Sequence, residues 1–323
     1  MEGWSSMRIL ITEPEDYSPD ALSRLRSIGE VILMDTPNES EVITVINDID
    51  ILVIRLGLYI GKDLIEKASR LKYILTATTG LNHIDVAAAD VAGIDIVSLK
   101  GETDFLDGVP STAEHTWGLI ISLFRNIHTA HQHVVQGDWN RQLLRGHNIK
   151  GKKLGIVGLG RVGSQVANYA HVFGCEINAY DPYLTTWPEY VSEKKTLQHI
   201  FEECDIISVH VPLEDSTRNL ISRDVLKYSK KGACLINTSR GEIWDEVAVA
   251  EYLESKHLGG VATDVIKNEQ DLMARQSNPL LKLLNSNHKS LLITPHIAGA
   301  TYESMKMTED FVVDKLFKKI KVH

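Results

Sequence analysis

The sequence has few of the residues that would build disulfides, metal clusters, membrane spans or nucleic-acid contacts. It contains three cysteines, Cys175, Cys204 and Cys234, and no C-x-x-C pair. This odd and widely spaced set excludes a disulfide framework, offers no metal-ligand cluster and is typical of a reducing compartment. No apolar run reaches the roughly 18 residues of a spanning helix. The formal net charge of −9 argues against nucleic acid and anionic membranes as partners.

The remaining composition is that of an ordinary globular protein. Hydrophobic residues make up 43% and charged residues 24% of the chain. The length of 323 residues exceeds the size at which single cores stop growing, about 250–300 residues, so we expect two domains. The N-terminal segment MEGWSSMRILITE lacks a basic stretch followed by an apolar core. We therefore expect no signal peptide and a cytoplasmic protein.

Short β-rich segments alternate with longer amphipathic segments. In the first part of the chain, strands are predicted at 7–12, 30–34, 49–54, 72–78 and 94–99, with helical patterns at 18–29 and 62–70. A second series of strands is predicted at 152–160, 176–181, 205–211, 233–239, 259–265 and 291–295. This alternation favours parallel βαβ units and two doubly wound α/β sheets.

Two longer helices are predicted at the junctions of these series. Residues 111–133 read as one helix with Ser111 as its N-cap, and residues 301–320 read as an amphipathic helix. The first would join the two sheets. The second would let the end of the chain return to the first domain.

The strongest local motif is the glycine loop Gly158-Leu-Gly160-Arg161-Val162-Gly163. It follows a predicted strand and opens a predicted helix, the context in which G-x-G-x-x-G binds a dinucleotide pyrophosphate. The next strand ends at Asp181, where a carboxylate can accept both ribose hydroxyls of NAD and repel the extra phosphate of NADP. The alternative is an α/β turn that contains glycines by chance. The context favours NAD.

Several segments together resemble the D-isomer-specific 2-hydroxyacid dehydrogenases. They are GVPSTAEHTWGLIISLFRNI (108–127), GDWNRQLLRGHNIKGKKLGIVGLGRVG (137–163), HVPLEDSTRNLI (210–221), LINTSRGEIWDE (235–246), GGVATDVIKNE (259–269) and TPHIAGAT (294–301). The resemblance implies a flavodoxin-like substrate domain formed by residues 1–105 and 296–323. It also implies an inserted Rossmann NAD domain at residues 106–295 and a homodimer formed largely through the NAD domains.

The resemblance implies three catalytic residues, and each has a chemical reason. Arg240, in LINTSRGE, matches the arginine that grips the substrate carboxylate and polarises the carbonyl. His296, in TPHIAGAT, matches the general acid/base, and Glu269 matches its carboxylate partner. A carboxylate beside an imidazole favours the protonated ring and fixes its tautomer. Alone, these residues would be a surface arginine, a solvated glutamate and a packed histidine.

The resemblance also implies further contacts with cofactor and substrate. The cofactor set comprises the glycine loop with Arg161 and Val162, and Asp181, His210, Pro212, Thr217, Thr238, Asp264, His296 and Gly299. By itself His210 reads as structural or solvated, as do His83 and His115. The substrate set comprises Arg240 with Thr79, Gly80 and Leu81, whose turn offers backbone N–H groups to the carboxylate, and Arg55 near the distal group. Arg55 reads equally well as a surface residue at a strand end.

Two departures from the family pattern bear on the substrate. Gln270 and the polar insertion DLMARQSN follow Glu269 where many relatives have proline, which predicts a looser loop. Residues 100–110, KGETDFLDGVP, also differ from many relatives. The first expectation is 3-phosphoglycerate and its keto form, and no regulatory extension is expected beyond His323. Glyoxylate or hydroxypyruvate reduction, an NAD-sensing corepressor-like protein and a relative that binds NAD without turnover stay open.

Overall fold

The computed structural model describes residues 7–35, 38–286 and 288–320. Residues 1–6, which contain part of the segment expected not to be a signal peptide, lie outside them. The chain divides into two compact units, unit 1 with residues Met1–Leu106 and Ala300–His323, and unit 2 with Asp107–Gly299. The second division follows Gly299 instead of Pro295, because Asp264 of unit 2 accepts hydrogen bonds from the backbone N–H groups of residues 296–298.

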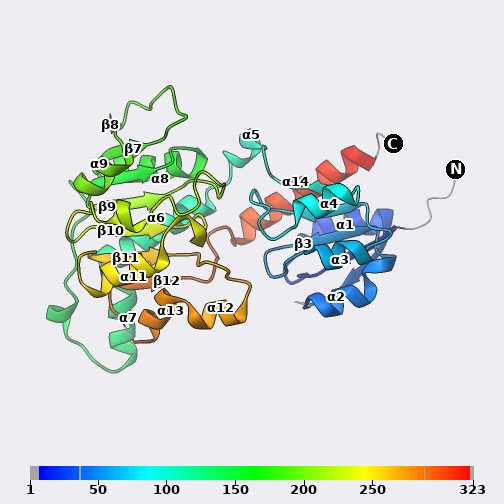
Figure 1. Ribbon diagram of the computed structural model, residues 1–323, viewed down its shortest axis with the longest axis horizontal. Coiled ribbons are helices and arrows are strands. Elements are labelled where there is room, and N and C mark those ends of the chain that lie inside the picture. Colours follow the sequence, from blue (N-terminus) through cyan, green and yellow to red (C-terminus); the bar gives the residue numbers. More distant parts are fainter. Residues whose placement is uncertain (1–6, 36–37, 287, 321–323) are drawn as a thin grey trace. The chain divides into compact units, whose positions relative to one another are not determined.

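Unit 1 is a parallel sheet covered by helices (Figure 1). Its strands are β1 (Met7–Ile11), β2 (Gly29–Leu33), β3 (Ile51–Ile54), β4 (Tyr73–Thr76) and β5 (Asp95–Val97). Its helices are α1 (Pro19–Ile28), α2 (Glu39–Val45), η1 (Ile46–Asp48), α3 (Lys62–Lys67), α4 (Val86–Val91), α5 (Thr103–Leu106) and α14 (Tyr302–Ile320).

The strands of unit 1 lie in the order β2-β1-β3-β4-β5, and all of them are parallel. This is the flavodoxin-like order, in which the strand sequence reverses between β1 and β3. Strand β3 is buried along its whole length, as a central parallel strand must be. Helix α14 packs against α1, β4 and β5, so the end of the chain completes the unit that the beginning started.

Unit 2 is a larger parallel sheet. Its strands are β6 (Lys153–Val157), β7 (Glu176–Tyr180), β8 (Val191–Lys194), β9 (Ile206–Val209), β10 (Cys234–Asn237), β11 (Gly260–Thr263) and β12 (Leu291–Ile293). Its helices are α6 (Ser111–Phe124), α7 (Ile127–Val135), η2 (Arg141–Leu144), α8 (Arg161–Val172), α9 (Leu197–Glu203), α10 (Arg223–Leu226), η3 (Gly241–Ile243), α11 (Glu246–Glu254), α12 (Leu272–Ser277) and α13 (Pro279–Asn285).

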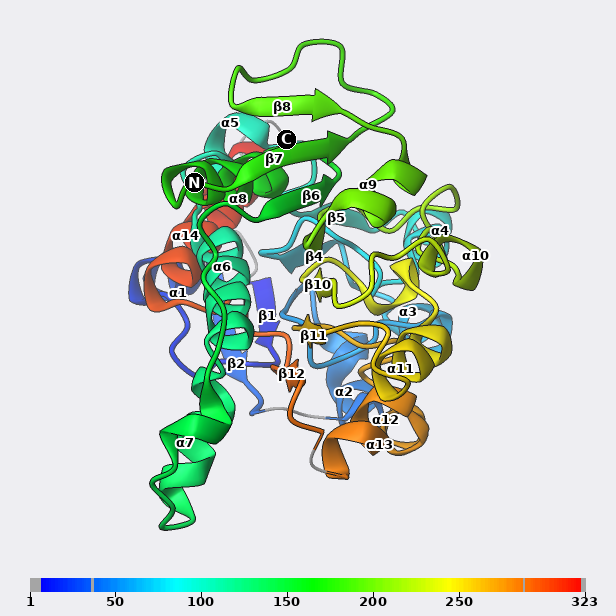
Figure 2. The same cartoon turned by 90° about the vertical axis from the view of Figure 1, so that its left-hand side faces the viewer.

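The strands of unit 2 lie in the order β12-β11-β10-β9-β6-β7-β8. The order reverses between β6 and β9, and doubly wound sheets bind ligands outside the carboxyl ends of the strands at such a point. Figure 2 shows α6 and α8 on one side of this sheet and α9, α10 and α11 on the other. Alternate strand residues supply two cores: Ile156 belongs to the core with α6 and α8, and Val157 belongs to the opposite core.

The predicted helix at 111–133 is two helices in the structure, and this expectation was wrong. Helix α6 ends at Phe124 and α7 starts at Ile127. Between them Asn126 has φ +54, a left-handed conformation that ends a helix, and its Nδ2 donates to the carbonyl of Arg145. Asparagine tolerates this conformation better than most residues, so the break is encoded locally.

Ser111 is the first residue of α6 and not its N-cap. Pro110 has the capping position, and its carbonyl accepts the first helical hydrogen bond from the N–H of Glu114 at 3.0 Å. The Ser111 hydroxyl is buried and makes no hydrogen bond to a residue that the structure describes. The predicted N-cap was therefore wrong by one residue, because Pro110 and not Ser111 occupies the capping position.

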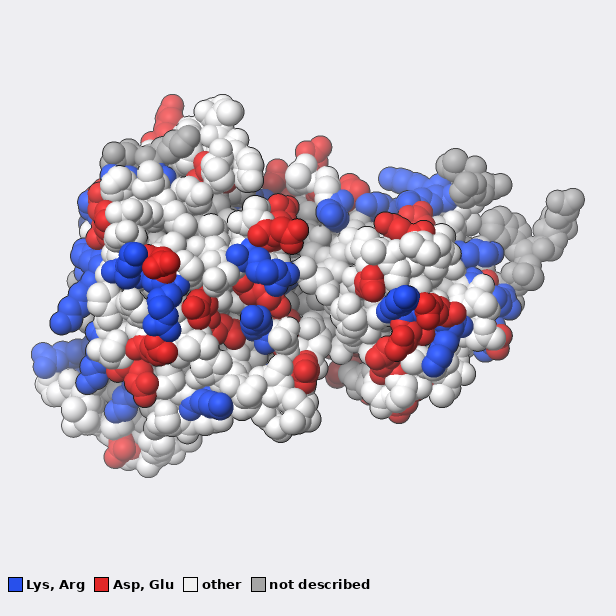
Figure 3. All heavy atoms as spheres, viewed as in Figure 1, with Lys and Arg blue, Asp and Glu red and all other residues white. Residues whose placement is uncertain are grey.

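Charges of both signs are interspersed on the face shown in Figure 3. Within the described ranges, no helix is long and apolar enough to cross a membrane. Cys175, Cys204 and Cys234 are free and buried, and burial raises the pKa of each thiol, that of Cys234 to about 12. These thiols are therefore poor nucleophiles near neutral pH. The cytoplasmic location that we expect from the sequence stays a prediction.

Candidate active site

The glycine loop follows β6 and reaches α8 within three residues. Gly158 has φ +90, and a Cβ there would lie 2.7 Å from the carbonyl oxygen of His210. A Cβ on Gly163 would lie 2.1 Å from the oxygen of Gly158, so only glycine lets the helix approach the strand. A Cβ on Gly160 would meet no atom within 4 Å. The second glycine therefore leaves an open approach to the N-terminus of α8, where an anion is stabilised.

Asp181 lies beside the glycine loop at the end of β7. Its Oδ2 accepts a hydrogen bond from the N–H of Leu159 at 3.0 Å. Its Oδ1 accepts from the N–H groups of Tyr183 and Leu184. The carboxylate is thus held next to the loop by backbone donors. This geometry fits the ribose-binding acid of a dinucleotide site.

His296 and Glu269 form a hydrogen-bonded pair. His296 Nδ1 contacts Glu269 Oε1, and the side chains are 21% and 22% exposed. Because Nδ1 is engaged by the carboxylate, Nε2 is the ring nitrogen left for a proton exchange with a ligand. His296 itself has φ +54 and Asn268, before Glu269, has φ +53. Such left-handed conformations of non-glycine residues cost energy and are concentrated at functional sites.

Arg240 follows β10, and its positive charge interacts with the negative charge of Glu269 in this pair. Burial lowers the pKa of its guanidinium, while the negative charges of Glu269 and Glu242 act in the opposite direction. Its Nη1 donates to the carbonyl of Ser239 at 2.7 Å. Arg240, Glu269 and His296 all belong to unit 2, and the structure brings a cation, a carboxylate and an imidazole together.

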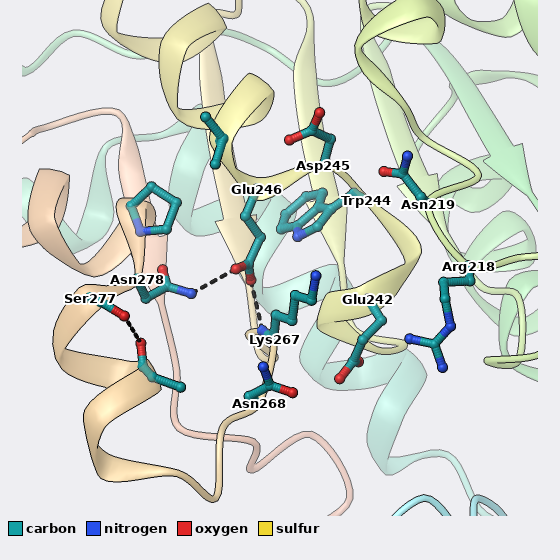
Figure 4. A pocket seen from close by; sticks show the side chains of 13 residues that line it. Arg218, Asn219, Glu242, Trp244, Asp245, Glu246, Lys267, Asn268, Ser277 and Asn278 are labelled. Atoms are coloured by element: carbon teal, nitrogen blue, oxygen red, sulfur yellow. Dashed lines mark hydrogen bonds between the residues drawn. The ribbon is translucent and has the colours of Figure 1, made fainter.

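Three hydrogen bonds hold the loop that carries Glu269 and the side chain of its partner Glu246. The N–H of Lys267 donates to Glu246 Oε1 at 2.8 Å, and Asn278 Nδ2 donates to Glu246 Oε2 at 2.7 Å (Figure 4). Arg275 Nη1, from α12, donates to the carbonyl of Glu269 at 2.5 Å. The insertion after Glu269 was expected to loosen this loop. In the structure it includes helix α12, which anchors the loop instead.

Glu246 is also in the wall of a cavity of about 580 Å³, shown in Figure 4. Burial raises the pKa of Glu246, although its two hydrogen bonds oppose the change. The cavity is lined by polar residues of both signs, including Arg218, Glu242 and Lys267. Neither His296 nor Arg240 lines it. The cavity thus adjoins the loop of Glu269 but does not include the predicted catalytic arginine and histidine.

Three of the proposed cofactor residues use their side chains within the protein. The hydroxyl of Thr116 donates to the carbonyl of Thr112, so the hydroxyl of Thr238 donates to Thr116 at 2.8 Å. Thr217 donates to the carbonyl of Pro212 at 2.6 Å and closes the turn after β9. His210 Nε2 bonds Ser208 at 2.7 Å, and burial lowers the pKa of His210 to about 3. Their contacts with a cofactor stay predictions.

The remaining members of the cofactor set lie near the glycine loop or at the end of unit 2. Arg161 begins α8, and its Nη1 donates to the carbonyl of Val109 at 3.1 Å. Val162 is half-buried and packs against the core beneath α8. A Cβ on Gly299 would meet no atom within 4 Å.

In unit 1, the turn after β4 presents its backbone. Thr78 donates to the carbonyl of Gly80 at 2.8 Å and shapes the turn. No described residue accepts a hydrogen bond from the N–H groups of Thr79, Gly80 or Leu81. These donors suit a carboxylate ligand. The structure describes each unit by itself, so their part in one site with Arg240 stays a prediction.

Arg55 follows β3, and its guanidinium makes its hydrogen bonds within unit 1. Its Nε and Nη2 donate to Glu309 Oε1 at 3.1 and 2.8 Å, and its Nη1 donates to the carbonyl of Glu15 at 2.8 Å. Arg55 is 21% and Glu309 3% exposed. The expected role near a substrate's distal group stays a prediction, and internal pairing now competes with it.

The sequence pointed to Asp264 as a cofactor contact but not to the part that it plays, with Thr294 and His115, in holding the loop of His296. Asp264, at the end of β11, is buried and accepts hydrogen bonds from the Thr294 hydroxyl at 2.6 Å and from the N–H groups of Ile297 and Ala298. Burial raises the pKa of Asp264, but hydrogen bonds from His115, Thr294 and the two N–H groups outweigh it and lower the pKa. His115 was expected to be structural or solvated, and only its place in the AEHT segment of α6 hinted otherwise.

No group of three metal-ligating side chains is found among residues 7–35, 38–286 and 288–320. The imidazole of His296, the carboxylate of Glu269 and the guanidinium of Arg240 suit a reaction of a small molecule through proton transfer and charge. The glycine loop and Asp181 suit a dinucleotide beside it.

Residues 117–298 match the profile described as "D-isomer specific 2-hydroxyacid dehydrogenase, NAD binding domain". The chain belongs to this family. Members of the family are NAD-dependent oxidoreductases, and unit 2 contains their NAD-binding domain. The fold, with two parallel α/β sheets, is the family's fold.

Relatives within the D-2-hydroxyacid dehydrogenase family differ in their substrates. A D-3-phosphoglycerate dehydrogenase of Methanocaldococcus jannaschii is 36% identical over 97% of this chain, which spans 57% of that protein. A hydroxypyruvate reductase of Thermotoga maritima is 35% identical over 97% of this chain and 98% of its own length. An NAD-dependent formate dehydrogenase of Staphylococcus aureus, solved with NAD, is 29% identical with a TM-score of 0.82 and covers 97% and 96% of the two chains.

Proposed function

We propose that this protein transfers hydride between a D-2-hydroxy acid and its 2-keto acid, with NAD as the cofactor. The observation that carries the proposal is the hydrogen bond between His296 and Glu269, coupled by charge to Arg240. Family membership supports the same reaction class.

The residues divide the chemistry between them. His296 takes the hydroxyl proton at Nε2 during oxidation and returns it to the carbonyl oxygen during reduction, while Glu269 holds Nδ1. Arg240 binds the carboxylate through its planar fork and stabilises negative charge on the carbonyl oxygen. The N–H groups of Gly80 and Leu81 provide a second carboxylate contact from unit 1.

The glycine loop and Asp181 would hold the dinucleotide. The open position at Gly160 and the N-terminus of α8 would receive the pyrophosphate, and Asp181 would accept the ribose hydroxyls. When bound, NAD supplies the hydride acceptor for oxidation, and NADH supplies the donor for reduction. Asp181 disfavours NADP by charge repulsion.

The first candidate substrate is 3-phosphoglycerate with its partner 3-phosphohydroxypyruvate. It is supported by similarity to the phosphoglycerate dehydrogenase of M. jannaschii, of which the chain spans 57%. Hydroxypyruvate or glyoxylate is the second candidate. It is favoured by the match over 98% of the T. maritima hydroxypyruvate reductase. It is also favoured by the ion pair of Arg55 with Glu309, because Arg55 is the cation that was expected near a distal phosphate and Glu309 already neutralises it.

A spectrophotometric screen tests these proposals. The purified protein and its His296→Ala variant are given NADH with glyoxylate, hydroxypyruvate, 2-ketobutyrate or 3-phosphohydroxypyruvate. We expect oxidation of NADH by the wild type with at least one acid and a loss of about 10²–10⁴-fold in the variant. Tight NADH binding without turnover of any acid would instead support the NAD-sensing alternative or a relative that has lost turnover.

We also propose a homodimer formed through unit 2. Helix α7 and the segment after it project from the sheet of this unit (Figure 2) and expose apolar side chains, with Trp139 87% and Leu143 70% exposed. Exposed apolar clusters mark interaction sites. Sedimentation of the wild type should give twice the chain mass, and a Trp139→Glu, Leu143→Glu variant should sediment as a single chain. A wild type of single-chain mass would refute the dimer.

A further inference from the structure

His115, on α6, is joined to the loop of His296 by two hydrogen bonds through Thr294, and its Nε2 also lies 3.5 Å from Asp264 Oδ1. His115 Nε2 lies 2.9 Å from the hydroxyl oxygen of Thr294, and that hydroxyl lies 2.6 Å from Asp264 Oδ1. All three residues belong to unit 2. Thr294 and Asp264 follow the neighbouring strands β12 and β11, so the chain links α6 to the carboxyl edge of the sheet.

The direction of each hydrogen bond follows from the acceptor at the end. An ionised Asp264 carboxylate only accepts, so the Thr294 hydroxyl donates to it. The remaining lone pairs of Thr294 then accept from His115 Nε2–H. In this order the N–H of His115 that faces Thr294 is on Nε2, and the threonine hydroxyl hydrogen points to Asp264.

Asp264 in turn fixes the backbone around His296. Its carbonyl accepts from the N–H of His296 at 2.8 Å, and its carboxylate accepts from the N–H groups of Ile297 at 2.9 Å and Ala298 at 2.7 Å. His296 has φ +54. A histidine keeps such a conformation only where its surroundings hold it, and three consecutive N–H groups bonded to one residue provide that hold.

We propose that His115 and Thr294 are positioning residues for the proton-transfer step at His296. They restrain the Asp264 carboxylate, which holds His296 in the left-handed conformation that places its ring against Glu269. The proposal rests on the proposed dehydrogenase function. It adds a role for His115 beyond packing, because α6 sets the geometry of the acid/base through two hydrogen bonds.

The position of a reacting group matters more to the rate than to binding. A displacement of about 1 Å at the chemistry can cost about 10²-fold in rate. Loss of this restraint should therefore lower kcat. The affinity for NADH should change little, because Asp264 itself is retained and the glycine loop that would bind the pyrophosphate follows a different strand, β6. A residue that only packs would lower the melting temperature without this selective effect on kcat.

Four single variants separate the two cases. Thr294→Val removes the hydroxyl at nearly constant shape, and Thr294→Ser keeps it. His115→Phe removes the ring donor. Thr129→Val is the matched control, because that hydroxyl donates to the carbonyl of Asn126 at 3.1 Å within α7, away from this chain of bonds. Each variant is assayed for kcat and KM with the acid that the wild type reduces fastest, for the dissociation constant of NADH by fluorescence, and for melting temperature.

We expect Thr294→Val and His115→Phe each to lower kcat by about 10- to 100-fold. The dissociation constant of NADH should change less than about threefold, Thr294→Ser should keep most of the activity, and Thr129→Val should match the wild type. The double variant His115→Phe, Thr294→Val should be little worse than either single variant, because both substitutions act through the Asp264 carboxylate.

Near-normal kcat in Thr294→Val, an equal loss in Thr294→Ser, or additive losses in the double variant would overturn the positioning role. These outcomes leave the dehydrogenase function standing as long as the wild type turns over and His296→Ala does not. If the wild type oxidises NADH with none of the acids, the proposed function itself fails. The positioning role, which depends on that function, then fails with it.

Discussion

Arg55 and Glu309 are 254 residues apart in the sequence and form an ion pair in unit 1 in which the glutamate is buried, and Nε and Nη2 of the arginine both donate to its Oε1. Burial raises the pKa of Glu309, whereas the hydrogen bond from the N–H of Ser18 and the contacts with Arg55 act in the opposite direction. The pair therefore joins the strand end after β3 to the C-terminal helix α14. An arginine in this position serves the fold of unit 1, whatever else it binds.

Replacing Arg55 should lower the stability of unit 1. Arg55→Met leaves Glu309 buried without its cation, and breaking such a pair costs about 3–5 kcal/mol. We expect a clear fall in the melting temperature, much of it recovered in the double variant Arg55→Met, Glu309→Gln. Arg26→Met, at an exposed position of α1, is the control and should leave the melting temperature unchanged.

Kinetics of the same Arg55 variants test its expected role in substrate binding. If Arg55 binds a distal phosphate, the stabilised double variant should raise KM for 3-phosphohydroxypyruvate and leave KM for hydroxypyruvate unchanged. If Arg55 only pairs with Glu309 and does not contact the substrate, neither KM should change. An unaltered melting temperature in Arg55→Met would contradict the structural duty.

Glu269→Gln should separate the carboxylate from the imidazole that it orients. The amide cannot stabilise a protonated ring as the carboxylate does, so kcat should fall by about 10- to 100-fold, less than in His296→Ala. Binding of NADH should be unchanged, since Glu269 lies outside the glycine loop. Stopped-flow measurement of the hydride-transfer step checks this. A loss larger than that of His296→Ala would show that Glu269 acts directly on the substrate.

Asp181→Ala should weaken NADH and relax the choice of cofactor. Loss of a charged hydrogen-bond acceptor to the ribose costs about 1.5–3 kcal/mol, or roughly 10- to 150-fold in affinity. NADPH should then bind no worse than NADH, because the repelling charge is gone. Fluorescence titrations with both dinucleotides check the ratio. Tighter binding of NADPH than NADH by the wild type would refute the assignment of NAD.

His210 should make the protein sensitive to acid. Its pKa is lowered by burial to about 3 in the folded state, against about 6.5 in the unfolded chain. Between these values the unfolded state binds more protons, so stability decreases as the pH falls below about 6.5. Near pH 5 the loss should be on the order of 1–2 kcal/mol.

The His210→Asn variant tests this pH dependence. Because the substitution also alters the hydrogen bond with Ser208, the quantity to compare is the change in melting temperature from about pH 7 to about pH 5, and not the melting temperature itself. The wild type should lose more than the variant over this interval. Equal losses would mean that His210 titrates normally in the folded protein.

Local patterns were sufficient for the fold and for the glycine loop. Each predicted strand is a short β-rich run, and the observed strands lie within one to a few residues of the predicted bounds, as with 291–295 against Leu291–Ile293. The glycines at 158 and 163 are fixed by backbone approach, a requirement that no other residue meets. The unforeseen strand β8 (Val191–Lys194) and the break at Asn126 depend on packing and on one left-handed residue.

The sequence by itself determined the order of the strands and helices and the dinucleotide motif, because these depend on residue type and spacing along the chain. Its resemblance to the family pointed to Arg240, Glu269 and His296. Only the tertiary structure decided which groups meet. It paired Arg55 with Glu309 and linked His115 through Thr294 to Asp264, and it placed the His296 ring on Glu269, the partner that the resemblance had implied. The physical reason is that parallel strands bring their carboxyl ends to one edge of a sheet from distant parts of the chain, and hydrogen bonds formed there leave no periodic signal in the sequence.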